Sequence, residues 1–247
     1  MRIQSVCVVA GVVGALFVST TAQAALTGLI STVKASPLNP RLFICNLYVT
    51  FSAPGDNLIA IVGLPAPGGQ LSYTTNSVGG FHQETVPIGA QDFPVDASFR
   101  ALFPNYIDDT YITIGLKHGY QGTDTTQHVG VLATDVPPGP TDWNAGGPLT
   151  SNAAAGGSYF VPPGAAQGVE IGGRVLIAQL VIDGNLATTN GLAPRINVFV
   201  PEITWADAAV NSQSTTINFS GSLHIPAPGT LVLLGLASLA GIRRRRR

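Results

Sequence analysis

The chain has 247 residues, of which 45% are hydrophobic and 10% are charged, and its formal net charge is −1. All thirteen acidic residues but only six of the twelve cations lie between the two ends, so the body has a formal charge of −7. An acidic body without a basic patch lacks the electrostatic pattern of nucleic-acid-binding proteins, and we expect no nucleic acid as a partner.

The first 24 residues have the pattern of a cleaved secretory leader, which we expect to be helical. Arg2 precedes an apolar run from Val6 to Val18, and the small residues Ala22 and Ala24 stand where signal peptidase recognises its substrates. An uncleaved N-terminal anchor is the alternative, but so short a run favours cleavage after Ala24. We therefore expect the body to be exported.

The body, residues 25–223, has the pattern of one all-β domain. Glycine and proline supply 47 of the 247 residues, and β-branched and aromatic residues cluster in short runs. No alternation of strands with helices indicates a parallel sheet, so we expect a two-layer antiparallel β-sandwich, jelly-roll or immunoglobulin-like in kind. The predicted strands are 27–33, 41–51, 57–62, 70–74, 81–85, 111–117, 129–133, 174–183, 195–200 and 214–220.

The two-residue period of a strand predicts which side chains are buried. In strand 111–117 the face of Ile112 is apolar, and the face of Tyr111 and Thr113 is expected in water. Strand 174–183 is apolar on both faces except at Gln179, so we expect it at the centre of a sheet. Cys45 falls in an alternating apolar row, which favours a buried hydrophobe over a reactive thiol.

Two long loops, 86–109 and 134–170, are predicted between the strands. In the first, Asp96 is expected to cap a short helix that runs to Phe103. The second is rich in proline, glycine and alanine. Loops of this length are uncommon in compact domains and often bind ligands.

No motif in the body supports catalysis, and we predict no catalytic residue. Nucleophile-elbow, metalloprotease, phosphate-loop and dinucleotide patterns are all missing from the sequence. Asp108 and Asp109 are the candidate cation ligands, because calcium prefers oxygen donors, although aspartate is also an ordinary turn residue. Calcium is thus the one cofactor considered, and a calcium-stabilised structural module stays open as an alternative function.

The tryptophans are the better candidates for binding. Trp143 lies between Asp142 and Asn144, and Trp205 also has polar neighbours. An indole can stack on a sugar ring while carboxylate and amide oxygens bind the sugar hydroxyls. The alternative is that Trp205 packs in the core and Trp143 pins its loop. We expect polysaccharide association or adhesion, with a secreted carbohydrate-active hydrolase as the alternative.

The C-terminal residues combine three unlike parts in a fixed order. Pro226, Ala227 and Pro228 precede an uncharged apolar run, 229–242. Five arginines then close the chain: Arg243, Arg244, Arg245, Arg246 and Arg247. The apolar run is a marginal membrane-spanning helix, and the arginines favour the cytoplasmic side, which places the body outside. A plain C-terminal membrane anchor would have the same orientation.

This tail resembles the sorting signal of PEP-CTERM proteins, which are bacterial surface proteins handled by an exosortase. The resemblance covers residues 224–247 and departs from the usual motif at Ala227, where the family has Glu. It implies an exosortase-type partner, transient anchoring in the inner membrane and a final place in the cell envelope or outside the cell. Family members are typical of bacteria that make exopolysaccharide and biofilm, but the resemblance implies no activity for the preceding domain.

Intact-mass spectrometry of the protein recovered outside the cytoplasm checks the processing of both ends. We expect a mass that lacks residues 1–24, because the small residues before Ala25 suit signal peptidase. A further loss that begins near Pro226 would show that the tail is also removed. A mass that still includes Met1 would contradict the cleaved leader.

Overall fold

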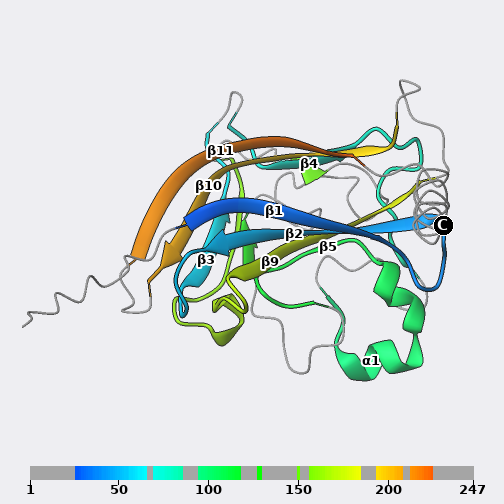
Figure 1. Ribbon diagram of the computed structural model, residues 1–247, viewed down its shortest axis with the longest axis horizontal. Coiled ribbons are helices and arrows are strands. Elements are labelled where there is room, and N and C mark those ends of the chain that lie inside the picture. The colour runs from blue at the N-terminus through cyan, green and yellow to red at the C-terminus, as the bar shows by residue number, and fades with distance from the viewer. Residues whose placement is uncertain are drawn as a thin grey trace, which may run out of the picture.

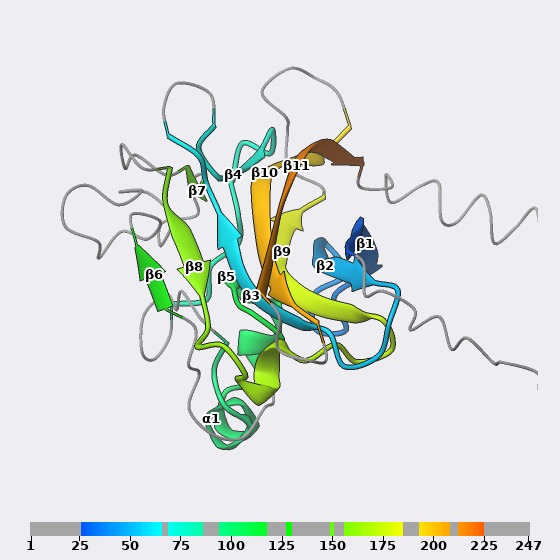
Figure 2. The ribbon, with the colours of Figure 1, turned by 90° about the vertical axis from the view of Figure 1, so that its left-hand side faces the viewer.

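The structure, a computed structural model, describes residues 26–65, 69–85, 94–117, 127–129, 149–150, 156–184, 193–207 and 212–224. Two antiparallel sheets pack together in it (Figures 1 and 2), which confirms the mostly-β, two-sheet expectation. The predicted leader helix and C-terminal membrane helix lie outside the described residues. Within the described part, no helix has the length and apolar character needed to cross a bilayer.

The first sheet has four strands in the order β1-β2-β9-β5. Their bounds are β1 (Leu26–Ala35), β2 (Leu42–Phe51), β9 (Arg174–Asp183) and β5 (Tyr111–Ile112). β9 lies between β2 and β5, and its residues 175–182 are all buried. The prediction of a central strand covered on both faces is therefore confirmed.

The second sheet has seven strands in the order β6-β8-β3-β10-β4-β7, with β11 paired to the other side of β10. Their bounds are β3 (Asn57–Val62), β4 (Ser72–Thr75), β6 (Gln127–Val129), β7 (Leu149–Thr150), β8 (Ser158–Phe160), β10 (Arg195–Ala206) and β11 (Ser212–His224). One end of β10 pairs with β4 and the other with β3, so this strand organises the sheet.

β10 extends beyond the predicted strand 195–200. Pro201, which directly follows the predicted strand, lacks the N–H group that a ladder needs. In the structure the register between β10 and β11 shifts between Val200 and Glu202, so the proline lies at a bulge, where the ladder is already interrupted. The strand passes through the proline and ends at Ala206.

The sequence predictions for residues 81–85 and 134–170 were also wrong. Residues 81–85 form no strand, although Phe81 is buried and the backbone N–H of His82 donates to the carbonyl of Val181 at 2.7 Å. The predicted loop 134–170 contains β7, β8 and a 3-10 helix, Ala166–Gly168. Strands of two or three residues show too little alternation for sequence periodicity to detect.

The segment before β5 covers part of the outer face of the first sheet. It forms α1 (Ala97–Leu102), visible below β5 and β9 in Figure 1, and the 3-10 helix Pro104–Asp108. The side chain of Asp96 accepts from the N–H of Phe99 at 2.9 Å, which confirms the predicted helix cap.

Gln179 fastens this segment to β9, because its Nε2 donates to the carbonyls of Ile107 and Asp109, each at 2.9 Å. Tyr111 and Thr113, expected in water, are therefore fully buried. Of the predicted strand 111–117, only Tyr111–Ile112 forms a strand, and a strand pattern does not reveal what packs on its outer face.

The inner faces of the two sheets form one apolar core. Cys45 is fully buried in it, and burial raises the pKa of its thiol to about 12. The prediction that Cys45 is a buried hydrophobe is confirmed. Core members from the first sheet include Phe43, Leu47, Val49, Phe51, Ile112, Ile177, Leu180 and Ile182, and those from the second include Leu58, Ile61, Ile196, Val198, Val200 and Ile203.

Two buried tyrosines of the second sheet link the sheets across this core. The hydroxyl of Tyr159 donates to the backbone carbonyl of Ile177 in β9 at 3.1 Å. Because a hydroxyl has a single proton, Tyr159 accepts at its other contact, from the hydroxyl of Tyr73 at 2.8 Å. Ile177 is the residue skipped where the register between β2 and β9 shifts, and its carbonyl also accepts from the N–H of Thr113.

The direction of these hydrogen bonds, from Tyr73 to Tyr159 and from Tyr159 to Ile177, predicts unequal costs for the two Tyr→Phe changes. Tyr159→Phe leaves the Tyr73 hydroxyl buried without its acceptor, so we expect a loss of about 1–3 kcal/mol in the free energy of unfolding. Tyr73→Phe removes one hydrogen bond and should cost about 0.5–1.5 kcal/mol. Adding Tyr73→Phe to Tyr159→Phe should recover stability, and urea unfolding of all three variants measures it. Strictly additive costs would contradict the assigned direction of donation.

Candidate functional site

Trp205 does not offer its ring to a ligand in this structure. It lies in β10 with 6% of its surface exposed, within the core cluster. Its ring packs against Phe51 with the centroids 5.9 Å apart and the planes inclined at 56°. Trp205 thus occupies the core position that the sequence left open as an alternative. Asp142, Trp143 and Asn144 lie outside the described residues.

Asp108 and Asp109 hold the segment before β5 in place. Both are buried, and Ser36 donates to Oδ2 of Asp108 at 2.7 Å, while the N–H of Glu84 donates to Oδ1 of Asp109 at 2.9 Å. Burial raises the pKa of Asp108, and the hydrogen bond from Ser36 opposes that shift. In the described part of the chain, no three His, Cys, Asp or Glu side chains come close enough to share a metal ion. The structure thus gives each of these two carboxylates a hydrogen bond within the protein, and a cation at Asp108 and Asp109 stays a prediction.

A second group of carboxylates gathers at one end of the sandwich. Asp56 lies in the turn between β2 and β3, Asp207 directly follows β10, and Glu170 donates its N–H to the carbonyl of Asp56 at 2.9 Å. Asp56 is fully buried, and neither of its carboxylate oxygens has a well-oriented hydrogen-bond partner among the described residues. Burial raises the pKa of Asp56, and the charges of Asp207 and Glu170 raise it further.

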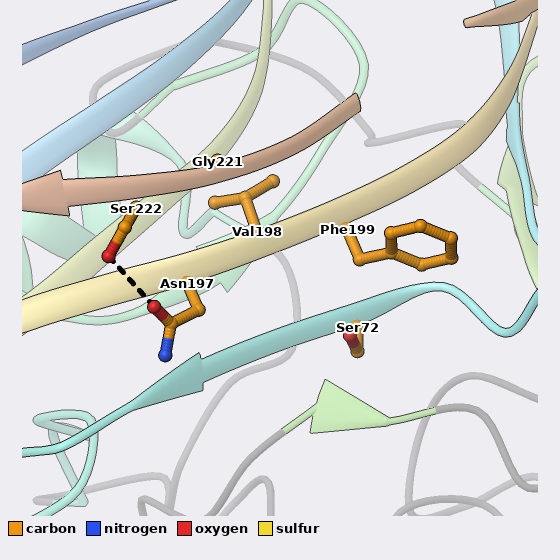
Figure 3. Close-up of a pocket in the computed structure, with 6 residues that line it drawn as sticks. All are labelled: Ser72, Asn197, Val198, Phe199, Gly221 and Ser222. Atoms are coloured by element: carbon orange, nitrogen blue, oxygen red, sulfur yellow. Dashed lines mark hydrogen bonds between the residues drawn. The ribbon is translucent and has the colours of Figure 1, made fainter. Parts of the chain in front are cut away.

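The outer face of the second sheet carries a shallow pocket with a volume of about 350 Å³ (Figure 3). We call it the Phe199 platform; its lining residues are Ser72, Asn197, Val198, Phe199, Gly221 and Ser222. Asn197 and Phe199 alternate with core residues along β10, so both side chains point outward. The ladder places Ser72 opposite Phe199 and Ser222 opposite Asn197.

Hydrogen bonds orient the polar groups of the Phe199 platform. The Ser222 hydroxyl donates to Oδ1 of Asn197 at 2.8 Å, as Figure 3 shows, and Nδ2 of Asn197 donates to Oγ1 of Thr74 at 3.4 Å. A half-buried phenyl ring thus lies beside an amide and two hydroxyls. No titratable side chain lines the platform, so its chemistry suits the binding of a neutral, hydroxyl-rich ring and supplies no general acid or base.

Comparison with known proteins identifies the C-terminal end. Residues 224–247 match the PEP-CTERM protein-sorting motif. The chain carries a PEP-CTERM sorting signal. This signal implies processing by an exosortase and an exported, cell-surface protein. No curated protein and no solved structure matches the chain.

Sequence patterns identified the PEP-CTERM signal but did not identify the Phe199 platform. Alternation within 196–200 already sets Asn197 and Phe199 on one face of a strand. Their partners Ser72 and Ser222 lie far from them along the chain and meet them only through the ladder. The sequence alone could therefore have predicted the shared face of Asn197 and Phe199, whereas their contacts with Ser72 and Ser222 required the strand register.

The raised pKa of Asp56 predicts that Asp56→Asn stabilises the protein at pH 7. An acid whose pKa is higher in the folded than in the unfolded chain destabilises the fold when ionised, and this penalty fades as the pH falls through the folded pKa. The advantage of the variant should therefore shrink on acidification and vanish below about pH 4, where the unfolded carboxyl is also protonated. Melting temperatures between pH 3 and pH 8 measure this.

Glu202→Gln, which removes one negative charge from β10, is the control for net charge. Calcium gives a second readout, because a cation bound at Asp56 would reverse the sign of the effect. We expect the wild-type melting temperature to be the same with calcium and with chelator. Calcium-dependent stabilisation that Asp56→Asn abolishes would contradict this prediction and support the calcium-stabilised module.

Proposed function

We propose that this protein is a non-enzymatic component of the cell surface or extracellular matrix that associates with polysaccharide through the Phe199 platform. One observation carries the proposal: an exposed face of the second sheet presents an aromatic ring beside oriented amide and hydroxyl groups. Aromatic rings flanked by a few placed polar groups suit sugar rings, which have apolar faces and hydroxyl edges. The PEP-CTERM signal agrees with it, because it directs the chain to the cell surface, where polysaccharide is present.

The route to the surface follows from the two ends of the chain. Signal peptidase removes residues 1–24, and the apolar run 229–242 then anchors the chain in the inner membrane with the arginines in the cytoplasm. The exosortase acts on this anchored form. The finished protein serves adhesion or binds exopolysaccharide in a biofilm matrix.

The hydrolase alternative finds less support. A glycosidase needs two carboxyl groups that face each other across a bound sugar. The Phe199 platform has none in its lining, and the described carboxylates of Asp108 and Asp109 accept hydrogen bonds within the protein. Binding without turnover is therefore the simpler activity for this platform.

Phe199→Ala should weaken binding to neutral polysaccharide by about two- to tenfold, because stacking on an aromatic ring is worth about 0.5–1.5 kcal/mol. Affinity electrophoresis of the exported protein in gels that contain dextran, galactomannan or hydroxyethylcellulose measures the change. Leu102→Ala is the matched control, since Leu102 is an exposed apolar residue on α1, away from the platform. Equal mobility of wild type and Phe199→Ala in every gel would refute the platform as the binding surface.

A further inference from the structure

A second pocket lies on the opposite side of the sandwich, on the outer face of the first sheet. Its volume is about 150 Å³, and we call it the Arg174 pocket. Tyr48 of β2 points outward into it, because its neighbours Leu47 and Val49 belong to the core. The lining residues are Tyr48, Gly115, Lys117, Val169, Ile171, Arg174, Val175 and Leu176.

Backbone pairing builds this pocket and brings its two cations together. Beyond β5 the chain continues alongside β9, since the N–H of Thr113 donates to Ile177 and that of Gly115 donates to Leu176. This course brings Lys117 to the beginning of β9, where Arg174 lies. Two of the six cations of the body thus share one small pocket.

Gly115 permits the tight packing of the pocket wall. It has φ +79°, and a Cβ atom there would lie 1.5 Å from the carbonyl oxygen of Gln167. Nε2 of Gln167 donates to the carbonyl of Ile114 at 3.0 Å. The wall is therefore a fixed part of the fold and holds Lys117 close to β9.

The guanidinium of Arg174 is positioned but has no anionic partner in the described structure. It lies over the ring of Tyr48, 4.6 Å from the centroid, which orients its flat face. An ion pair within the described residues joins Arg41 to Asp183 and involves neither Arg174 nor Lys117. Glu170, close in sequence, uses its two carboxylate oxygens to accept from the N–H groups of Gly55 and Gly173.

These features define the chemistry of the missing partner. A guanidinium with a free edge binds a carboxylate through two parallel hydrogen bonds, and a nearby ammonium adds a second charge. Tyr48, Leu176 and the exposed Ile171 supply an apolar ledge beside the charges. A carboxylate attached to a sugar ring satisfies both parts of such a site.

We infer that the Arg174 pocket binds the carboxylate of an acidic sugar residue in a polysaccharide. This inference rests on the proposed association with polysaccharide and adds a second contact with a different specificity. The net charge of −7 on the body as a whole repels densely charged polyanions. The pocket should therefore favour chains with sparse carboxylates, in which one acidic sugar enters and its neighbours are neutral.

Affinity electrophoresis in pectins of graded methyl esterification tests the inference, with galactomannan as the neutral reference. The wild type should bind sparsely de-esterified pectin more tightly than fully esterified pectin. Arg174→Gln should lower the affinity for the sparse acid about tenfold, while the affinity for galactomannan is unchanged. Arg174→Lys, which keeps the charge but not the paired hydrogen bonds, should lie between them.

Lys34→Gln is the matched control, because Lys34 is exposed on β1 and its loss changes the net charge equally. Equal effects of Arg174→Gln and Lys34→Gln, or no preference of the wild type for free carboxylates, would overturn the inference. Retained binding to galactomannan in that case would leave the proposed function standing.

Titration with free galacturonate tests the Arg174 pocket independently of the proposed association with polysaccharide. Its titration should shift the ring resonances of Tyr48 in the wild type and leave them unmoved in Arg174→Gln. This result would support the pocket even if no polysaccharide were retained and the proposed function failed. Unmoved Tyr48 resonances in the wild type would overturn the inference directly.

Discussion

Burial between the two sheets has to stabilise this protein without a covalent cross-link, because Cys45 has no second cysteine in the body to pair with. Each polar group left unsatisfied in such a core would cost about 1–3 kcal/mol. The hydroxyls of Tyr73 and Tyr159 meet the constraint by pairing with each other and with the carbonyl of Ile177. These two hydroxyls thereby link the sheets instead of weakening the core between them.

The carbonyl of Ile177 lies at a register shift in the first sheet and accepts a hydrogen bond from the second sheet. Ile177 stands where β9 slips by one residue against β2, and its carbonyl accepts from both Thr113 and Tyr159. On the outer face of the same strand, Gln179 binds the segment that carries α1. β9 therefore organises three layers: the second sheet on one side, its own sheet, and the covering segment on the other side.

Sequence patterns predicted the elements whose cause is local. The Asp96 cap depends on four neighbouring residues, and the apolar run of β9 predicted its central place. Patterns failed where contacts are distant, as for Tyr111 and Thr113, which the segment before β5 covers, and for Pro201, which a bulge accommodates. The candidate surfaces follow the same division. The sequence favoured the tryptophans as binding residues, but Trp205 is in the core. The half-buried rings of Phe199 and Tyr48 acquire polar neighbours only through strand register.

The sorting signal begins where the last strand of the sandwich ends, so the signal can be processed without disturbing the described strands. The matched motif begins at His224, which is also the last residue of β11. β11 supplies Gly221 and Ser222 to the Phe199 platform and stays paired with β10 up to the pair of His224 with Arg195. Every described pair between β10 and β11 and every platform residue lies at or before this pair, so removal of the residues beyond it leaves them in the chain. The inner faces are committed to the core, so a role at the cell surface depends on the outer faces, which processing leaves intact.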